Sequence, residues 1–285
     1  MTPTEFAFLA RFLKERSGIV IGEDKRYLVE SRLGPIARKA GIASLSELAQ
    51  RLMRGGDTAL AQSVVEAMTT NETFFFRDGA PFTQFSDVLL PEFAKTRAAQ
   101  KRVRIWCAAC STGQEPYSLA MALEDKAAQY PGWRFEIVAT DLASEVVDRA
   151  RTGLFSQFEV QRGLPIKLLL KHFTQEGDRW RIAAKLRERV QFRTLNLLRD
   201  FSPLGQFDVV FCRNVLIYFD EPTKADILGR IGKQLAPDGA LLLGSAETVL
   251  GLNAAFRPHP SHRGLFVPTP PGAAPSAFRL ASAVR

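Results

Sequence analysis

Apolar residues near the start of the chain recur at helical spacing. Phe6, Leu9 and Leu13 are three and four residues apart, which places them on one face of a helix. Thr2 is followed three residues later by Glu5, the pattern of a capping box at a helix start. The sequence therefore predicts an amphipathic helix that begins close to the N-terminus and buries one apolar stripe.

Three more helices are expected in this first part of the chain. The second would span about 24–40, and Gly34-Pro35 would kink or break it, because proline lacks the backbone donor and clashes with the preceding turn. The third would begin after Ser44 and the fourth after Asp57, since both residue types are good N-caps. These segments predict a small all-helical domain.

Beyond residue 103, short apolar runs alternate with amphipathic segments. The expected strands are residues 103–107, 135–140, 207–212, 240–243 and 264–267, the last at a sheet edge. The expected helices between them are residues 116–128, 143–150 and 222–235. This alternation is typical of an α/β fold, in which helices cover both faces of a mostly parallel sheet.

One segment breaks the alternation. Residues 172–173, 180–182 and 190–192 resemble short antiparallel strands around a turn at 176–178, which predicts a small β-insertion on the main sheet. The last residues, 269–285, are rich in Pro, Ala and Ser and are expected to be a disordered tail.

Composition narrows the class of protein. Three cysteines in 285 residues cannot form a disulfide framework, no secretory signal begins the chain, and no apolar run reaches the ~18 residues of a membrane span, so a cytoplasmic protein is expected. The net charge of +8 favours an acidic partner. Nucleic acid is discounted, because the chain has no run of five or more Lys or Arg.

Candidate chemistry lies where the expected strands end, since ligands of open parallel sheets bind at the carboxyl ends of strands. Residues 109–116 follow the first strand and contain small side chains, although they could form an ordinary strand-to-helix turn. Asp141 ends the second strand, where its carboxylate could accept hydrogen bonds from ribose hydroxyls or cap the next helix. Cys107 and Cys110 form a Cys-x-x-Cys, but further metal ligands are missing, so no metal is expected and small core residues are the preferred interpretation.

Four sequence blocks in order resemble the CheR-type chemotaxis receptor methyltransferases, over essentially residues 5–268. The blocks are NETFFFR at 71–77, CSTGQEPYS at 110–118, ATDL at 139–142 and FDVVFCRNVLIYF at 207–219. The resemblance implies a Rossmann-like S-adenosylmethionine-dependent methyltransferase with a small N-terminal helical domain. The expected divisions are a docking domain at 1–70, a linker to the cofactor site at 71–80, and a methyltransferase domain at 81–268 with a β-insertion at about 171–193.

The same resemblance implies a set of residues that contact S-adenosylmethionine, whose product is S-adenosylhomocysteine. They are Asn71, Thr73, Arg77, Glu115, Asp141, Asn196, Leu197, Arg213 and Asn214. Glu115 suits the cofactor ammonium or a position just behind it, and Asn196 with Leu197 could read the adenine edge.

The implied reaction is protein-glutamate O-methylation. A glutamate carboxylate is ionised at neutral pH, with an ordinary pKa of about 4.3, so a strong general base is not required. Arg77 and Tyr218 are the expected catalytic residues that hold the incoming carboxylate, because arginine offers a fork of donors and tyrosine a directed hydroxyl. The phenylalanines at 74–76 are expected to pack and exclude water.

The implied partner is the helical bundle of a chemoreceptor cytoplasmic domain. Lys25, Arg32 and Lys39 recur every seven residues, with Arg26 and Arg38 elsewhere on the same helix, and could form either a solvated surface or a basic docking face. Some family members grip a peptide at the receptor C-terminus with a glycine-rich hairpin in the β-insertion. Here the turn at 174–179 is compact with a single glycine, which predicts independence of that peptide.

Two other functions stay open from the sequence. One is a non-catalytic module that binds S-adenosylmethionine and signals its presence, and the other is a methyltransferase that acts on another protein carboxylate or a small acid. The motif set favours an enzyme that methylates receptors in chemotaxis adaptation, acting as a monomer that is recruited to receptor clusters at the membrane.

Overall fold

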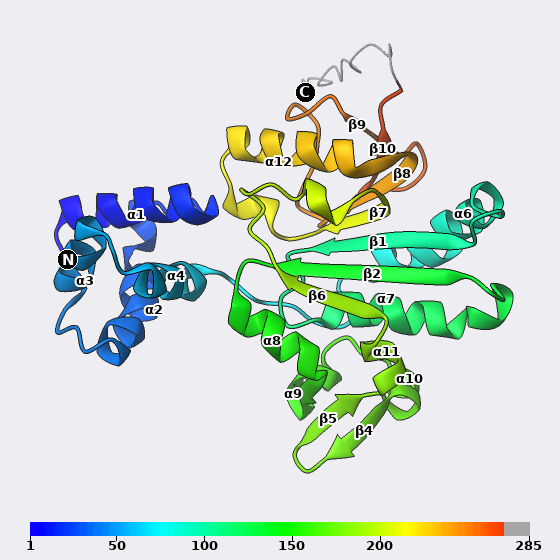
Figure 1. Cartoon of the computed structure of the whole chain (residues 1–285), viewed down its shortest axis with the longest axis horizontal. Coiled ribbons are helices and arrows are strands. Elements are labelled where there is room, and N and C mark those ends of the chain that lie inside the picture. The colour runs from blue at the N-terminus through cyan, green and yellow to red at the C-terminus, as the bar shows by residue number, and fades with distance from the viewer. Residues whose placement is uncertain (271–285) are drawn as a thin grey trace, which may run out of the picture.

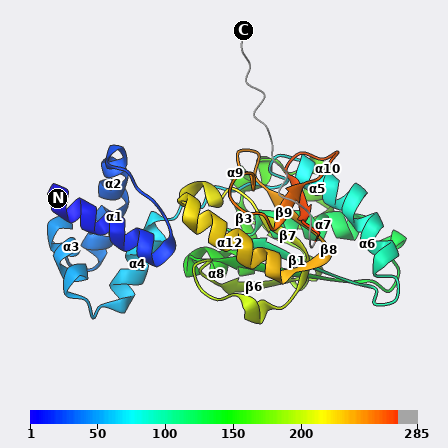
Figure 2. The same cartoon turned by 90° about the horizontal axis from the view of Figure 1, so that it is seen from above.

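The chain folds into a helical lobe and a larger sheet domain that stand side by side (Figures 1 and 2). The computed structural model describes residues 1–270, and the predicted tail at 269–285 lies almost entirely outside these residues. Within the described part of the chain, no helix is both long and apolar enough to cross a membrane.

The N-terminal lobe contains the expected helices. They are α1 (Pro3–Ser17), α2 (Arg26–Lys39), α3 (Leu45–Arg54) and α4 (Thr58–Met68), with a short 3-10 helix (Glu23–Lys25) before α2. The capping box of Thr2 and Glu5 is present, and the side chains of Ser44 and Asp57 cap α3 and α4. A kink or a break was expected at Gly34-Pro35, and the break is wrong, because α2 continues through Pro35 while the stripe of Val29, Leu33 and Ala37 remains buried.

The main sheet is mostly parallel, as expected. Its seven strands lie in the order β6-β2-β1-β7-β8-β10-β9, with parallel pairing from β6 to β8 and antiparallel pairing of β10 with β8 and β9. Their bounds are β1 (Arg102–Ala108), β2 (Arg134–Asp141), β6 (Val190–Thr194), β7 (Phe207–Cys212), β8 (Leu235–Leu243), β9 (Phe256–Pro258) and β10 (Leu265–Pro268). The expected edge position of residues 264–267 is wrong, since β9 forms that edge.

Alternate residues of β1 enter different cores on the two faces of the sheet. Ile105 and Cys107 pack into the core that contains α7 and α8, whereas Trp106 and Ala108 pack into the core that contains α12. The helices on these faces and before β1 are α5 (Ala80–Gln84), a π-helical turn (Phe85–Leu89), α6 (Leu90–Thr96), α7 (Gln114–Asp125), α8 (Ser144–Thr152) and α12 (Glu221–Gln234). Short 3-10 turns complete the domain at Ala127–Gln129, Ser202–Leu204 and Leu216–Tyr218.

The small β-insertion exists, but its composition differs from the prediction. Its sheet has the order β3-β5-β4, formed by β3 (Leu154–Ser156), β4 (Phe173–Glu176) and β5 (Arg179–Ile182). Residues 190–193 were expected in the insertion, and this is wrong, because β6 pairs in parallel with β2 in the main sheet. Three short helices accompany the insertion: α9 (Gln157–Gln161), α10 (Ile166–His172) and α11 (Ala184–Arg187).

Candidate functional site

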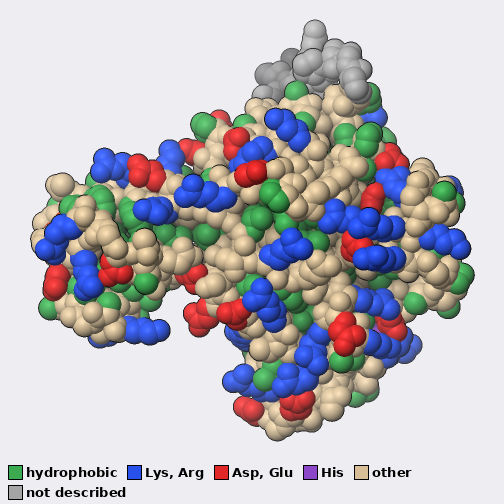
Figure 3. All heavy atoms as spheres, viewed as in Figure 1, with side chains coloured by type: hydrophobic (Ala, Val, Ile, Leu, Met, Phe, Trp, Pro, Cys, Tyr) green, Lys and Arg blue, Asp and Glu red, His purple; other side chains and the backbone are tan. Residues whose placement is uncertain are grey.

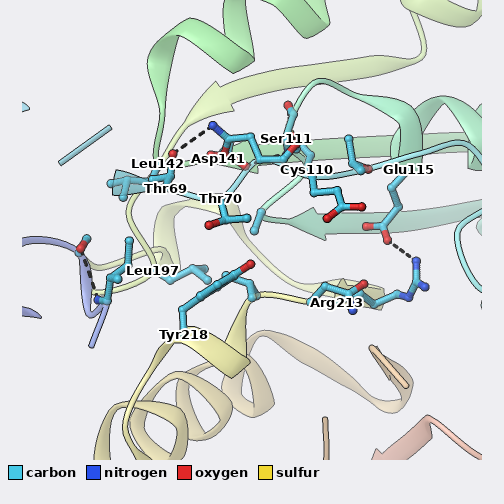
Figure 4. A pocket seen from close by; sticks show the side chains of 18 of the residues that line it. Thr69, Thr70, Cys110, Ser111, Glu115, Asp141, Leu142, Leu197, Arg213 and Tyr218 are labelled. Carbon is cyan, nitrogen blue, oxygen red and sulfur yellow. Dashed lines mark hydrogen bonds and ion pairs between the residues drawn. The ribbon is translucent and has the colours of Figure 1, made fainter. Parts of the chain in front are cut away.

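A cavity opens at the carboxyl ends of β1, β2 and β7, where the sheet domain meets the helical lobe (Figure 4). Its empty volume is about 900 Å³, including the open mouth. Every residue expected at the cofactor or at the incoming carboxylate lines it: Asn71, Thr73, Arg77, Glu115, Asp141, Asn196, Leu197, Arg213, Asn214 and Tyr218. The four motif blocks therefore converge on one site, although they are far apart in the sequence.

Asp141 is held rigidly at the end of β2. Its Oδ2 accepts a hydrogen bond from the Ser111 N–H at 2.8 Å, and its Oδ1 accepts one from the Ala143 N–H at 3.1 Å. Burial raises the pKa of the Asp141 carboxyl, and these two hydrogen bonds oppose the rise. The contact with Ala143 does not make Asp141 the cap of α8, because the N-cap residue is Ala143 itself and no side chain caps this helix. Each Asp141 oxygen keeps a lone pair for a hydroxyl in the cavity.

Glu115 and Arg213 form a buried ion pair at another wall of the cavity, drawn as a dashed line in Figure 4. Arg213 Nη1 lies 2.8 Å from Glu115 Oε2, and Arg213 Nη2 donates to Asp78 Oδ2 at 2.7 Å and to the Arg77 carbonyl at 2.8 Å. Burial raises the pKa of Glu115, and the neighbouring guanidinium opposes that rise. Arg213 Nε is buried without a partner among the described residues.

The linker after α4 shapes the cavity through its backbone and packs through its phenylalanines. Ser111 Oγ donates to the Asn71 carbonyl at 2.8 Å, which ties the linker to the loop after β1. Phe75 is fully buried in the core of the sheet domain. The Phe74 ring contacts two guanidinium groups, with its centroid 5.5 Å from that of Arg77 and 4.7 Å from that of Arg162. The expected packing role of these aromatic residues agrees with these contacts.

The helical lobe forms a wall of the cavity, which the sequence did not indicate. Ser17 at the end of α1 and Ile19 just after it line the cavity, and the Val20 N–H donates to the Tyr218 carbonyl at 2.9 Å. Asn196 Nδ2 donates to the Arg16 carbonyl at 2.6 Å. The Asn196 side chain thus joins the two domains in this structure, rather than pointing its amide freely at a ligand.

Gly18, in the turn after α1, allows the close approach of this segment to the loop around Tyr218. Its φ of 79° lies in the left-handed region, and a Cβ there would stand 3.0 Å from the Phe219 ring. A glycine after the last helical residue is typical of a helix C-cap, so the sequence could have indicated the turn. It could not have indicated what the turn packs against.

Family models match both parts of the chain. A model described as CheR methyltransferase, all-alpha domain, matches residues 4–69, and one described as CheR methyltransferase, SAM binding domain, matches residues 71–265.

The chain belongs to the CheR methyltransferase family.

Curated relatives agree with this membership. The chain is 46% identical to "Chemotaxis protein methyltransferase 1" of Pseudomonas aeruginosa, over 87% of this chain and 91% of the relative. It is 44% identical to "Chemotaxis protein methyltransferase Cher2" of Pseudomonas putida, over 85% of this chain and 89% of the relative. It is also 41% identical to "Chemotaxis protein methyltransferase 1" of Vibrio cholerae, over 88% of this chain and 92% of the relative.

As a CheR-family methyltransferase, the protein uses S-adenosylmethionine, and the cavity residues fit this cofactor. Two buried carboxylates, those of Glu115 and Asp141, suit an ammonium group and vicinal hydroxyls. The unpartnered Nε of Arg213 is a buried donor with spare capacity for an anionic group. Backbone in the left-handed region at Ala109 (φ 64°) and Ser111 (φ 50°) turns the loop after β1 around the cavity.

The three cysteines are buried and free. Burial raises the pKa of each thiol well above its ordinary value, which keeps Cys107, Cys110 and Cys212 protonated and unreactive. Over residues 1–270, no group of three or more His, Cys, Asp or Glu side chains is placed to hold a metal ion.

The five basic residues expected on the docking face of the CheR-family helical domain are not equivalent. Arg32 Nη1 donates to the carbonyls of Met68 and Thr69, at 2.9 and 2.8 Å, and so fastens the end of α4. Lys25, Arg38 and Lys39 are exposed, and the half-buried Arg26 reaches the Met1 carbonyl. Figure 3 shows Lys and Arg side chains spread over this lobe and over the region of the small β-sheet.

Proposed function

We propose that this CheR-family enzyme methylates glutamate side chains on the cytoplasmic domains of chemoreceptors, as a protein-glutamate O-methyltransferase in chemotaxis adaptation. Support comes from relatives whose names place them in chemotaxis and from one observation in the cavity. Arg77 and Tyr218, which could hold a carboxylate, line the same cavity as the buried carboxylates that suit the cofactor.

The chain's own residues would do four things in the reaction. S-adenosylmethionine supplies an electrophilic methyl group on a sulfonium. Arg77 would bind the substrate carboxylate with its fork of donors, and the Tyr218 hydroxyl would orient the attacking oxygen. Asp141 would fix the ribose, and the walls from the linker and from Ser17 and Ile19 would exclude water. Since the attacking carboxylate is already ionised, alignment and desolvation carry the catalysis.

The proposed docking surface is formed by the exposed basic residues of α2 and of the 3-10 helix before it. Lys25, Arg38 and Lys39, with Arg26 at its edge, would attract the acidic helices of a receptor bundle. Arg32 is left out of this surface because it serves α4. The enzyme would act in the cytoplasm as a monomer recruited to receptor clusters, with no need for nucleic acid or membrane insertion.

We also propose that the enzyme does not depend on a receptor C-terminal peptide. The turn between β4 and β5 has two residues outside the strands, Gly177 and Asp178, and lacks the extra glycines of peptide-gripping relatives. Isothermal calorimetry with receptor-tail peptides should give no binding at micromolar concentrations. Micromolar affinity would contradict this proposal without affecting the methyltransferase assignment.

The decisive experiment is incubation with methyl-labelled S-adenosylmethionine and receptor cytoplasmic domains, followed by detection of base-labile methyl esters. Labelled esters on receptor glutamates are expected. Tight cofactor binding without ester formation would instead favour a non-catalytic sensor of the cofactor, and labelling of other carboxylates only would favour another substrate.

Two variants test the carboxylate-holding residues. Arg77→Ala and Tyr218→Phe should each lower turnover by about 10²-fold, because both remove a directed donor at the reacting group. Matched controls are Arg257→Ala and Tyr130→Phe, since neither residue lines the cavity. Unchanged turnover in the first pair would refute the assigned roles.

A further inference from the structure

The loop after β7 carries three of the residues expected at the cofactor or the substrate, yet its backbone is irregular. Arg213, Asn214 and Tyr218 all lie between β7 and α12, and Asn214 has a left-handed φ of 58°. Only a 3-10 turn, Leu216–Tyr218, gives the loop regular structure. Four consecutive N–H groups, those of residues 214–217, are not bonded to any backbone carbonyl in the described chain.

A single carboxylate accepts hydrogen bonds from all four of these groups. Glu247 Oε2 accepts from the Asn214 N–H at 2.7 Å. Glu247 Oε1 accepts from the N–H groups of Val215 at 3.0 Å, Leu216 at 2.7 Å and Ile217 at 3.3 Å. A fifth donor is the Gly244 N–H, at 2.8 Å from Oε2. Hydrogen bonds to a carboxylate are about twice as strong as neutral ones, so this contact set is the main anchor of the loop.

Gly244 makes room for the arrangement. A Cβ on this residue would lie 2.7 Å from both Glu247 Oε2 and Asn214 Nδ2, and 3.0 Å from the Asn214 nitrogen. A side chain there would therefore push the carboxylate and the loop apart. The end of β8 and the residues after it thus provide both the anion and the space that the loop requires.

We propose that Glu247 is a positioning residue of this methyltransferase, which holds the loop so that Asn214 faces the cofactor and Tyr218 faces the substrate. Glu247 does not line the cavity, and its effect passes through the backbone of the loop. The part that concerns Tyr218 rests on the proposed function. The part that concerns Asn214 rests only on cofactor binding.

The test variant is Glu247→Gln, which keeps the side-chain shape but turns an amide N–H₂ toward backbone donors. The dissociation constant for S-adenosylhomocysteine, measured by calorimetry, should rise about tenfold. Turnover per folded molecule should fall about 10²-fold, as expected when reacting groups are displaced by about 1 Å. Affinity and turnover are compared well below the melting temperature of the variant, on fully folded protein, which separates positioning from a general loss of stability.

The matched control is Glu188→Gln, the same change on an exposed glutamate whose side chain makes no hydrogen bond or ion pair with residues 1–270; only its backbone N–H is bonded, to the Ala184 carbonyl. The dissociation constant for S-adenosylhomocysteine and the turnover of this control should both match those of the wild type. Equal S-adenosylhomocysteine affinity in Glu247→Gln and wild type, within twofold, would overturn the proposal. If receptor glutamates are not the substrate, turnover on receptors is absent in every variant while the change in affinity persists, so the two failures are distinguishable.

If Glu247→Gln does not fold, amide hydrogen exchange on the wild-type protein decides the matter. The amides of residues 214–217 should be strongly protected, although they lie in a loop without backbone partners. Exchange at the rate of an open loop would overturn the proposal, and protection would support it.

Discussion

The buried ion pair between Glu115 and Arg213 can be tested with a double-mutant cycle. Their side chains are 11% and 1% exposed, so both charges are nearly removed from water. Breaking such a pair by removing one partner costs about 3–5 kcal/mol, because it leaves an uncompensated buried charge. In Glu115→Met, Asp78 still contacts Arg213 at 2.7 Å, so the loss of stability should lie at the lower end of this range, at about 3 kcal/mol.

Arg213→Met should respond differently to pH. The remaining Glu115 can take up a proton, whereas an arginine cannot release one. Burial already raises the pKa of Glu115, so the folded state binds this proton more tightly than the unfolded state. Stability of this variant should therefore increase as pH falls from neutrality toward the ordinary value of 4.5.

Removing both charges should cost less than the sum of the two single losses. The expected coupling is in the upper part of the range of about 0.5–3 kcal/mol for residues in direct contact, because both charges are buried. Urea unfolding at pH 7 of wild type, both single variants and the Glu115→Met/Arg213→Met double variant measures it. As a control, the exposed pair Glu92 and Lys95, 62% and 71% exposed, should give less than about 1 kcal/mol. Additivity within about 0.5 kcal/mol at the buried pair would refute the reasoning.

Three further predictions concern stability. Burial lowers the pKa of His172 below its ordinary value of 6.5, so the unfolded chain takes up this proton at a higher pH than the folded protein does. Stability should therefore drop as pH falls below about 6.5, and His172→Met should flatten this dependence in thermal melts. Gly163→Ala should lower the free energy of unfolding by about 1–3 kcal/mol more than Gly177→Ala does. Both glycines have a positive φ, but only at position 163 would the new Cβ meet a backbone oxygen, at 2.1 Å. Equal melting temperatures of the two variants would contradict this. Arg32→Ala should lower stability by about 1–3 kcal/mol, whereas Lys39→Ala should leave it unchanged and weaken only receptor binding, as measured by co-sedimentation.

Local signals in the sequence predicted local structure well. The N-caps Thr2, Ser44 and Asp57 begin helices where expected, because capping depends on residues within one turn. Strand β7 matches its predicted range of 207–212, since a central parallel strand is apolar and buried at almost every position, here at all except the half-buried Asp208. The convergence of the motif blocks at one cavity follows from the parallel sheet, in which strand ends share an edge.

Non-local features were beyond the sequence pattern. Strand β6 alternates buried and exposed residues, so its pattern equally suits an antiparallel insertion or an edge of the main sheet. Only its pairing with β2, some fifty residues earlier, decides between them. Arg32 fits a heptad of surface charges by spacing, yet its guanidinium is taken up by carbonyls at the end of α4.

The hardest residues to foresee are those whose partners are backbone atoms. Glu247 accepts hydrogen bonds from five backbone N–H groups. Any residue type except proline would present the same donors, so the residue types at 214–217 cannot predict the contact. The same is true of Val20, whose N–H meets the Tyr218 carbonyl. Both contacts end on the loop that carries the proposed substrate-holding tyrosine. Side chains that would perform the chemistry are thus recognisable from motifs, whereas the groups that place them are defined only once the backbone is folded.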